Sequence, residues 1–225
     1  VAEQVIAVFS GVRGFLDDVE LNKIKSFETG LIEKIKSDKP ELIDKIQSTF
    51  FQCYFDSYKT EESFKKLISD KENDFTRYNF FFANYLIKKN KNSEAIKIIE
   101  SSLKLSPRNL LLNQLIIDLR QSKKNIFKDK FNCKNLSHIA AELFYIISNA
   151  LSSRAMYFES NFHLNLAKYL NPDFTSYNNL YAENFYMIKN FDKSKNIYSK
   201  IKLIGEIYNW HATKKISLIL IKQGK

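Results

Sequence analysis

The chain has 225 residues and a formal net charge of +10, but only 5 Gly and 3 Pro. So few turn-forming residues argue against a turn-rich all-β fold, and a hydrophobic content of 44% argues against a disordered chain. No apolar stretch approaches the roughly 20 residues that a membrane-spanning helix needs. We therefore expect an all-α protein, built from long helices joined by short loops.

The composition changes abruptly near residue 50. Residues 1–50 carry 7 Lys and Arg against 9 Asp and Glu, whereas the remainder carries 28 against 16, so the net charges are −2 and +12. All 12 Tyr follow residue 50, and so does every Asn except Asn22. No Pro-, Gly- or Ser-rich linker marks the change. We expect two parts, residues 1–50 and residues 51–225.

The first part is expected to form three short helices. Gly11 and Gly14 interrupt an initial apolar face, because Gly is unfavourable inside helices. A second helix is predicted after Glu20, and Pro40 suits the first turn of a third helix. The apolar residues expected on the buried sides of the second and third helices are Ile24, Phe27, Leu31, Ile35, Leu42, Ile43 and Ile46.

Four motifs in this first part carry a family resemblance. They are Val1-Ala2-Glu3-Gln4-Val5, Gly11-Val12-Arg13-Gly14-Phe15-Leu16-Asp17-Asp18, Lys23-Ile24-x-x-Phe27-Glu28 and Lys39-Pro40-Glu41-Leu42. In this order and spacing, residues 1–48 resemble the C-terminal helical domain of the F-type ATP synthase alpha subunit. The resemblance implies a position low in the catalytic head, with nucleotide binding in an upstream domain. The chain has no G-x-x-x-x-G-K-[ST] phosphate loop and departs from the family pattern after Ile46.

The second part shows an internal repeat. Three pairs of matching residues lie 34 positions apart: Ser148 and Ala182, Ser160 and Ser194, and Leu164 and Tyr198. An earlier copy of the repeat is formed by Ala83, Ala95, Ser102 and Pro107, which are separated by 12, 7 and 5 residues. The same three separations recur between Ser148, Ser160, Ala167 and Pro172. The phase between these two copies is 65, so the unit at about residues 110–140 is irregular by three residues.

A period of 34 residues is typical of tetratricopeptide repeats, in which small side chains let two antiparallel helices approach closely. Residues 51–225 resemble this family, and three further motifs resemble repeat proteins of alphaproteobacteria: Ala140-Ala141-Glu142-x-x-Tyr145, Asn165-Leu166-Ala167-x-Tyr169-Leu170-Asn171-Pro172 and Tyr208-x-Trp210-x-Ala212. The resemblance implies an α-solenoid. The expected helices are residues 75–89, 93–105, 110–120, 138–152, 158–170, 175–188, 191–202 and 208–222.

Repeat scaffolds of this kind bind extended peptides in a concave groove. Asn84 and Asn149 share one repeat phase and could hydrogen-bond a peptide backbone, although a solvated helix face is the simpler alternative for any one position. The groove lacks a regular Lys and Arg pattern, so we expect no clamp for a C-terminal carboxylate. The groove residues predicted from repeat phase are Phe80, Asn84, Lys88, Tyr145, Asn149, Glu183 and Tyr186.

Catalytic, metal and cofactor sites are not expected. Cys133 and His138 form one close pair, but zinc usually needs a second such pair. Cys53 lies 80 residues before Cys133, and two Cys do not constitute a disulfide framework. His163 and His211 are isolated, and no spacing suggests a nucleophile beside a base. We expect no metal, no cofactor and no enzymatic activity.

The basic second part raises the alternative of nucleic-acid binding. However, Lys outnumbers Arg by 30 to 5 and is interleaved with acidic residues, as on solvated helix faces. Trp210 lies in the last predicted helix, where we expect it to pack against the preceding helix pair rather than anchor at a membrane interface.

The favoured function is a non-catalytic scaffold that holds a peptide or a partner helix in its groove. One alternative is a fragment of the ATP synthase alpha subunit that contributes to assembly of the catalytic head, with the other synthase subunits as partners. A second is a basic nucleic-acid-binding protein, and a third is that two unrelated genes are joined near residue 50. We expect a cytoplasmic protein or one peripheral to the inner membrane. The periplasm stays open because the sequence starts without Met.

Overall fold

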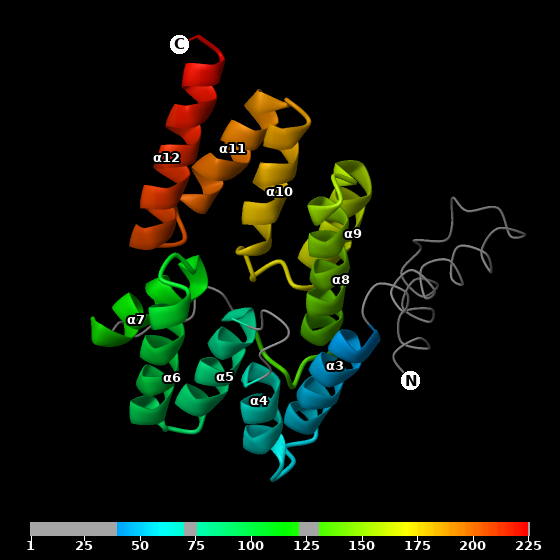
Figure 1. Cartoon of the computed structure of the whole chain (residues 1–225), viewed down its shortest axis with the longest axis vertical. Coiled ribbons are helices and arrows are strands. Elements are labelled where there is room, and N and C mark those ends of the chain that lie inside the picture. Colours follow the sequence, from blue (N-terminus) through cyan, green and yellow to red (C-terminus); the bar gives the residue numbers. More distant parts are fainter. Residues whose placement is uncertain (1–39, 70–75, 122–130, 225) are drawn as a thin grey trace, which may run out of the picture.

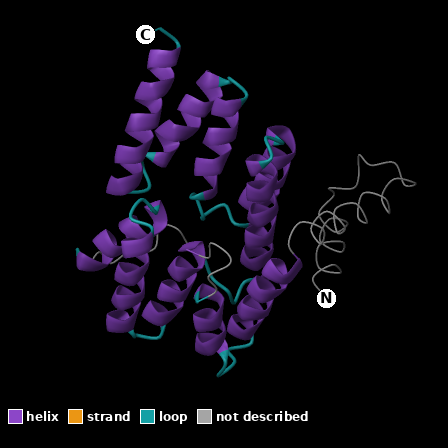
Figure 2. Cartoon of the chain, viewed as in Figure 1, coloured by secondary structure: helices purple, strands orange, loops and turns teal. Residues whose placement is uncertain are grey.

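The computed structural model describes residues 40–69, 76–121 and 131–224. Ten α-helices, labelled α3 to α12, occupy these residues, and no strand occurs among them (Figure 2). The predicted all-α fold is therefore confirmed. The first two helices predicted for residues 1–50, and the side chains of Leu42 and Ile43 in the third, lie outside this description.

Five helices form a first row (Figure 1). They are α3 (Pro40–Tyr54), α4 (Thr60–Ile68), α5 (Thr76–Lys88), α6 (Asn92–Leu105) and α7 (Leu110–Arg120). Each helix of the row packs against the next one along the chain. The last three of these helices correspond closely to the predicted segments 75–89, 93–105 and 110–120.

The other five helices form a second row, which lies above the first in Figure 1. They are α8 (Leu136–Ser153), α9 (Tyr157–Leu170), α10 (Tyr177–Met187), α11 (Phe191–Ile201) and α12 (Glu206–Lys222). Helix α8 starts two residues earlier than the predicted segment, because the Asn135 side chain accepts a hydrogen bond from the Ser137 amide at 2.9 Å and caps the helix.

Three helix pairs make the same turn at the same repeat phase. Asn90, Ala155 and Lys189 each lie two residues after the first helix of a pair and adopt a left-handed backbone, with φ of 62°, 60° and 62°. In each turn the next residue's amide donates to a carbonyl five positions earlier, at 2.9 to 3.0 Å. The turn satisfies carbonyls at the helix end, and it reverses the chain into an antiparallel pair.

The predicted small residues lie where the paired helices touch. Ala83 and Ala95 are fully buried between α5 and α6. In the two later pairs the hydroxyl of the second helix bonds to the first: the Ser160 hydroxyl donates to the Ser148 carbonyl at 2.7 Å, and that of Ser194 to the Ala182 carbonyl at 2.8 Å. This packing is consistent with a helical repeat solenoid.

The irregular unit near residues 110–140 is where the array changes from one row to the other. Helix α7 packs against α5 and α6, whereas the next described helix, α8, packs against α3 at the opposite end of the first row. Helices α7 and α12 also meet, so the two rows contact each other at both ends. The helix pairs are thus doubled into two stacked rows rather than arranged in a single open curve.

An aromatic cluster joins the rows. Phe50 of α3 and Phe81 of α5 lie 5.2 and 4.4 Å, between ring centroids, from Phe131, which lies before α8. Phe174, before α10, lies 5.8 Å from Phe81. Each aromatic side chain buries about 150–250 Å² of surface, so this cluster is a major source of cohesion between the rows.

Helix α3 continues without interruption through the composition change near residue 50. Ile46, which the sequence placed on the buried side, is 1% exposed, and Phe50 is fully buried in the aromatic cluster. The described end of the first part therefore shares its core with the second part.

At the other end of the rows, Gln114 of α7 connects to α12. Its side chain accepts a hydrogen bond from the Ile207 amide at 3.0 Å and donates one to Asp118 at 2.9 Å. Gly205 allows this close approach, because a Cβ atom at that position would overlap the Gln114 side chain.

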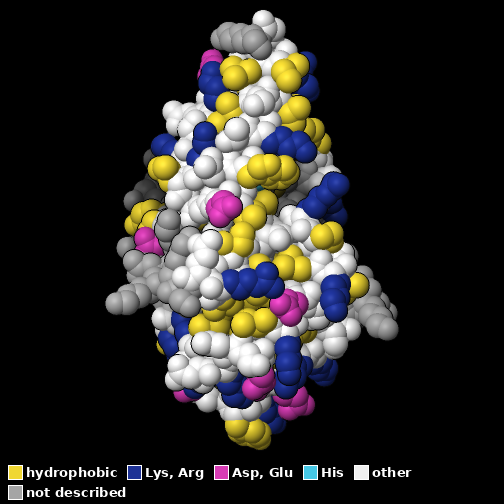
Figure 3. All heavy atoms as spheres, turned by 90° about the vertical axis from the view of Figure 1, so that its left-hand side faces the viewer, with side chains coloured by type: hydrophobic (Ala, Val, Ile, Leu, Met, Phe, Trp, Pro, Cys, Tyr) yellow, Lys and Arg dark blue, Asp and Glu magenta, His cyan; other side chains and the backbone are white. Residues whose placement is uncertain are grey.

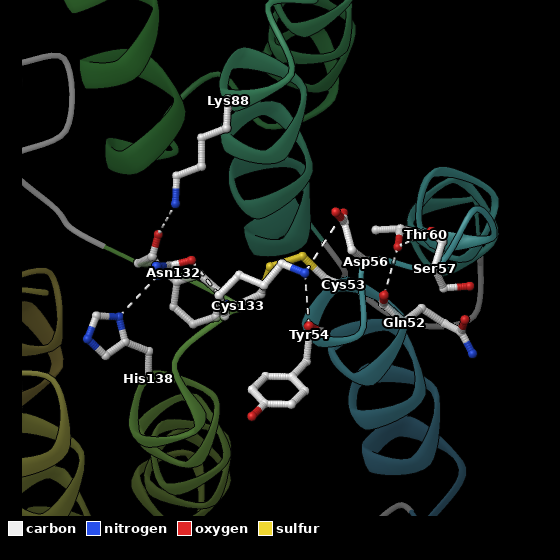
Figure 4. The surroundings of a disulfide bond; sticks show 12 residues. Gln52, Cys53, Tyr54, Asp56, Ser57, Thr60, Lys88, Asn132, Cys133 and His138 are labelled. Atoms are coloured by element: carbon white, nitrogen blue, oxygen red, sulfur yellow. Dashed lines mark hydrogen bonds and ion pairs between the residues drawn. A yellow bond between two sulfur atoms is a disulfide. The ribbon is translucent and has the colours of Figure 1, made fainter.

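A disulfide between Cys53 and Cys133 links α3 to the segment that leads into α8 (Figure 4). Two Cys so far apart in sequence gave no reason to expect a disulfide, and the structure shows that they form one. Polar contacts hold the same segment: Lys88 donates to the Phe131 carbonyl at 3.1 Å and Lys134 to the Tyr54 carbonyl at 2.9 Å.

The surface is mixed in character. On the face shown in Figure 3, basic, acidic and apolar side chains are interspersed. Trp210 is 68% exposed on α12, so the expectation that it packs in the core is wrong. Within the described residues, no helix combines the length and the apolar character needed to cross a membrane.

Candidate functional site

A pocket of about 210 Å³ lies where the two rows face each other. The first turns of four helices, α5, α7, α10 and α12, contribute to it together with the middle of α8. Its lining residues are Arg77, Asn109, Leu110, Leu111, Tyr145, Ser176, Asn179 and Tyr208. The wall is therefore made partly of apolar side chains and partly of amide, hydroxyl and guanidinium groups.

Local sequence explains how the α7 side of the pocket forms. Pro107 ends the preceding segment, and the Asn109 side chain then accepts a hydrogen bond from the Leu112 amide at 3.0 Å. Asn113 donates to the Pro107 and Asn109 carbonyls, both at 2.8 Å. These bonds fix the start of α7, so that Leu110 and Leu111 face the pocket.

A buried ion pair forms the base of the site. Arg77 at the start of α5 donates two parallel hydrogen bonds to Glu142 of α8, from Nε at 2.5 Å and from Nη2 at 2.8 Å. The Tyr177 hydroxyl also donates to the Glu142 carboxylate, at 3.3 Å. The Arg77 guanidinium carbon lies 3.9 Å from the ring centre of Tyr145 and 5.2 Å from that of Phe174.

The electrostatics of this pair result from burial and mutual attraction. Burial is the largest single influence and favours the neutral form of Arg77, but the charge and hydrogen bonds of Glu142 together with Tyr145 and Tyr177 outweigh burial and raise the pKa of Arg77 well above its usual value. Burial raises the pKa of Glu142, and the attraction of Arg77 opposes that rise. We treat both groups as ionised, because a two-bond guanidinium–carboxylate contact is the geometry that stabilises a desolvated pair.

Two polar residues at the start of α10 form the opposite wall: Ser176 directly precedes the helix, and Asn179 lies in its first turn. Ser176 is 7% exposed, and its hydroxyl has no hydrogen-bond partner in the structure. The side-chain oxygen of Asn179 contacts Nε2 of His211 at 2.9 Å. Since an amide oxygen only accepts, His211 carries its proton on Nε2.

Most of the groove residues predicted from repeat phase lie elsewhere. Tyr145 lines the pocket and stacks on Arg77. Phe80 and Asn84 are 3% and 4% exposed, so they are buried within α5. Lys88 is exposed at the end of α5, but its ammonium group donates to the Phe131 carbonyl, and partial desolvation lowers its pKa.

The remaining three predicted residues lie on α8 and α10. Asn149 is exposed on α8. Glu183 accepts hydrogen bonds from the Tyr198 hydroxyl at 2.8 Å and from Lys215 at 2.7 Å. Tyr186 lies beneath the Lys222 ammonium, 4.7 Å from it. Of the seven predicted residues, Tyr145 is therefore the one in the pocket lining.

Sequence reasoning missed the ion pair and the polar wall. Glu142 gave a usable signal, because it is a lone charge in the apolar run from Ile139 to Phe144 and such a residue needs a buried partner. Nothing in the sequence identified Arg77 as that partner, because it lies 65 residues away. Ser176 and Asn179 carried no signal.

The residues considered as metal ligands have other contacts. Cys133 is in the disulfide, and Nδ1 of His138 accepts a hydrogen bond from the Asn132 amide at 3.1 Å. Nδ1 of His163 contacts the Glu159 carbonyl at 2.9 Å. Among the residues whose positions are described, no group of three or more His, Cys, Asp or Glu is placed to hold a metal ion.

Comparison with known families shows a match at the start of the chain. Residues 1–70 match the family model of the ATP synthase alpha/beta chain, C terminal domain, which supports the resemblance seen in residues 1–48. The match ends within the first row, soon after α4. No solved structure matches the chain. Similarity to the ATP synthase C-terminal domain is therefore established for the first 70 residues, and the pocket lies beyond them.

Proposed function

We propose that the chain is a non-catalytic helical-repeat scaffold that binds a peptide or a partner helix. The observation that carries this proposal is the pocket between the two rows, whose polar lining consists mainly of amide and hydroxyl side chains. Such groups both donate and accept hydrogen bonds, so they suit a peptide backbone. Apolar Leu110 and Leu111 beside them suit an apolar side chain of the partner.

The chemistry around the pocket supports binding rather than catalysis. His211 contacts the lining residue Asn179 through the amide oxygen of that side chain. This contact does not place the imidazole beside a hydroxyl or thiol nucleophile. Arg77 and Glu142 bond to each other. The arrangement therefore supplies preformed hydrogen-bonding groups, and it shows no nucleophile held beside a base.

A peptide array probed with the purified chain tests this proposal. We expect a subset of peptides to bind. Tyr145→Phe should weaken peptide binding because it removes a hydroxyl from the pocket. Asn149→Ala should also weaken it, because it removes an exposed amide from the adjoining face of α8. Tyr169→Phe is the matched control, since Tyr169 is 57% exposed on α9, away from the pocket lining. Absence of any peptide above background, or equal binding by all variants, would contradict the proposal.

The family match favours a second candidate function, which is participation in assembly of the ATP synthase catalytic head. Under this alternative, the immobilised chain should retain purified beta and gamma subunits. Asn149→Ala should leave that retention unchanged, because the match ends at residue 70. Failure to retain either subunit at micromolar concentration would exclude this role and leave the scaffold proposal intact.

A further inference from the structure

We propose that the pocket between the rows is a carboxylate-binding site, in which Arg77 and the Ser176 hydroxyl hold the bound group. The inference specifies the ligand chemistry of the pocket on which the proposed scaffold function rests. It also extends beyond that function, because a small organic acid and the carboxylate of a peptide present the same group. It departs from the expectation of no carboxylate clamp, which rested on the lack of a regular Lys and Arg pattern, because the pocket contains a single Arg held by Glu142.

Arg77 provides the charge. It is the one ionisable cation among the lining residues, and none of those residues is acidic. A guanidinium has five N–H donors in a fixed fork, and the two bonds to Glu142 use two of them. The Arg77 side chain is 17% exposed, so part of it remains accessible.

The position of Arg77 is fixed in advance. Glu142 accepts hydrogen bonds along one edge of the Arg77 guanidinium, and the Tyr145 ring covers one face of it, with the ring centre 3.9 Å from the guanidinium carbon. A side chain held in this way loses little further conformational freedom on binding, so more of the interaction with a ligand is realised as affinity. Carboxylates are also the groups that a planar guanidinium fork recognises best.

Ser176 is the second, independent observation. Buried polar groups in proteins almost always have a hydrogen-bond partner, and an unpaired one calls for an explanation. The Ser176 hydroxyl is buried, has no partner and belongs to the pocket wall. A carboxylate oxygen in the pocket would accept a hydrogen bond from the Ser176 hydroxyl, which would then no longer be buried without a partner.

Glu142 limits the charge that the site accepts. With Arg77 and Glu142 both ionised, the pair has no net charge. A single negative charge can be stabilised by the remaining Arg77 donors and by the positive ends of the surrounding helices. The second charge of a phosphate would lie near the Glu142 carboxylate without a cation of its own, so the site should prefer carboxylate to phosphate.

The size of the pocket restricts the ligand further. Sites for drug-sized ligands have volumes of roughly 300–1,000 Å³. The present pocket of about 210 Å³ is smaller, so it suits a short organic acid or the last residue of a peptide. Leu110 and Leu111 would contact the apolar part of either ligand.

Calorimetric titration of the full chain with paired probes tests the inference. N-acetyl-L-alanine should bind, and N-acetyl-L-alaninamide, which differs only in lacking the carboxylate, should bind at least tenfold more weakly. Inorganic phosphate should also be at least tenfold weaker than N-acetyl-L-alanine. Acetate, and N-acetyl tetra-alanine with a free or an amidated C-terminus, distinguish a small acid from a peptide end as the source of the group.

Two variants separate binding from folding. Ser176→Ala removes a hydroxyl that has no partner, so the fold should be at least as stable, while the affinity for N-acetyl-L-alanine should fall about threefold or more. The double variant Arg77→Met with Glu142→Met replaces the ion pair by apolar side chains of similar size and should abolish binding without unfolding the chain. Ser153→Ala is the control, because Ser153 is exposed on α8 outside the pocket.

Equal binding of the acid and the amide, no binding of either at millimolar concentration, or unchanged affinity in Ser176→Ala would each overturn the inference. Binding of small acids with no peptide bound in any assay would support the carboxylate site and contradict the scaffold function. If peptides with free and amidated C-termini bind equally well and the free acids do not bind, the carboxylate site is contradicted and the scaffold function is supported.

Discussion

At the residue scale, Arg77 and Glu142 show how one buried contact connects the two rows. The pair joins α5 to α8, and Tyr177 of α10 adds a third group to the Glu142 carboxylate. Glu142 is fully buried, so its charge depends entirely on these partners. A buried pair of this kind contributes little net stability, but the loss of one partner leaves an uncompensated charge.

We therefore predict that Arg77→Met alone destabilises the chain by about 3–5 kcal/mol. The double variant Arg77→Met with Glu142→Met should lose far less, because no charge is left without a partner. Urea unfolding followed by circular dichroism measures both values. A single variant as stable as the double one would show that the pair is not desolvated as the structure indicates.

The pH dependence of stability is a second prediction at this scale. Burial, followed by repulsion from Lys215, lowers the pKa of His211, and Glu183 only partly opposes this shift. Burial likewise lowers the pKa of His138. Both histidines are harder to protonate in the folded chain than in the unfolded chain, so the unfolded state binds more protons at mildly acidic pH.

The contribution of these two histidines to the free energy of unfolding should therefore be fully present above the ordinary histidine pKa of 6.5 and should decrease as the pH falls below it, whereas the raised pKa of Glu142 acts in the opposite direction. Urea unfolding at several pH values between 7.5 and about 5 measures this slope. His211→Gln, which keeps a hydrogen-bond donor toward Asn179, should reduce the slope. A profile that rises on acidification would contradict the assigned direction.

At the element scale, the helix pairs are held together by small residues at fixed repeat positions. Ser148 is fully buried where α8 meets α9, and its carbonyl accepts a hydrogen bond from Ser160. The neighbouring Asn149 is exposed on the same helix. These two adjacent positions provide a direct test of the packing, because they share a helix but not a surface.

Ser148→Leu should destabilise the chain by about 1–3 kcal/mol or more, since a larger side chain forces α8 and α9 apart. Asn149→Leu should change stability by less than about 0.5 kcal/mol, as expected for a surface substitution. Thermal and urea unfolding of the two variants measure the difference. Equal stability would show that α8 and α9 do not pack as closely as described.

Elements of this kind could be predicted well from sequence. Pro107 and Pro172, together with the spacing of Ala83, Ala95, Ser148 and Ser160, placed the helices from α5 to α12 to within about two residues, because caps, breakers and apolar period are local properties. Helix α4, which precedes the repeat pattern, was not predicted. The pattern did not show that Trp210 is exposed on α12.

At the scale of the whole molecule, the disulfide connects the start of the first row to the start of the second. Cys53 and Cys133 are 80 residues apart in sequence, and their Cα atoms lie 5.9 Å apart. Disulfides of this kind persist in oxidising environments. Its surroundings also tie the segment before α8 to α3 and α5 (Figure 4).

Reduction of this bond should lower the free energy of unfolding by about 4.5 kcal/mol, because it releases a long closed loop in the unfolded chain. Urea unfolding with and without dithiothreitol measures the effect. The double variant Cys53→Ala with Cys133→Ala should be destabilised to a similar extent and should not respond to dithiothreitol. A wild-type chain insensitive to dithiothreitol would show that the bond does not form in solution.

The helical class, the repeat spacing and most helix ends of α5 to α12 follow from local sequence, because they depend on contacts within a few residues along the chain. The doubling of the array into two rows, the contact between Arg77 and Glu142, and the bond between Cys53 and Cys133 became visible in the folded chain alone. These partners are 65 and 80 residues apart, and the pocket exists only because the rows bring such distant segments together. Local periodicity specifies the helices, whereas the burial of aromatic side chains between the rows specifies how the helices meet.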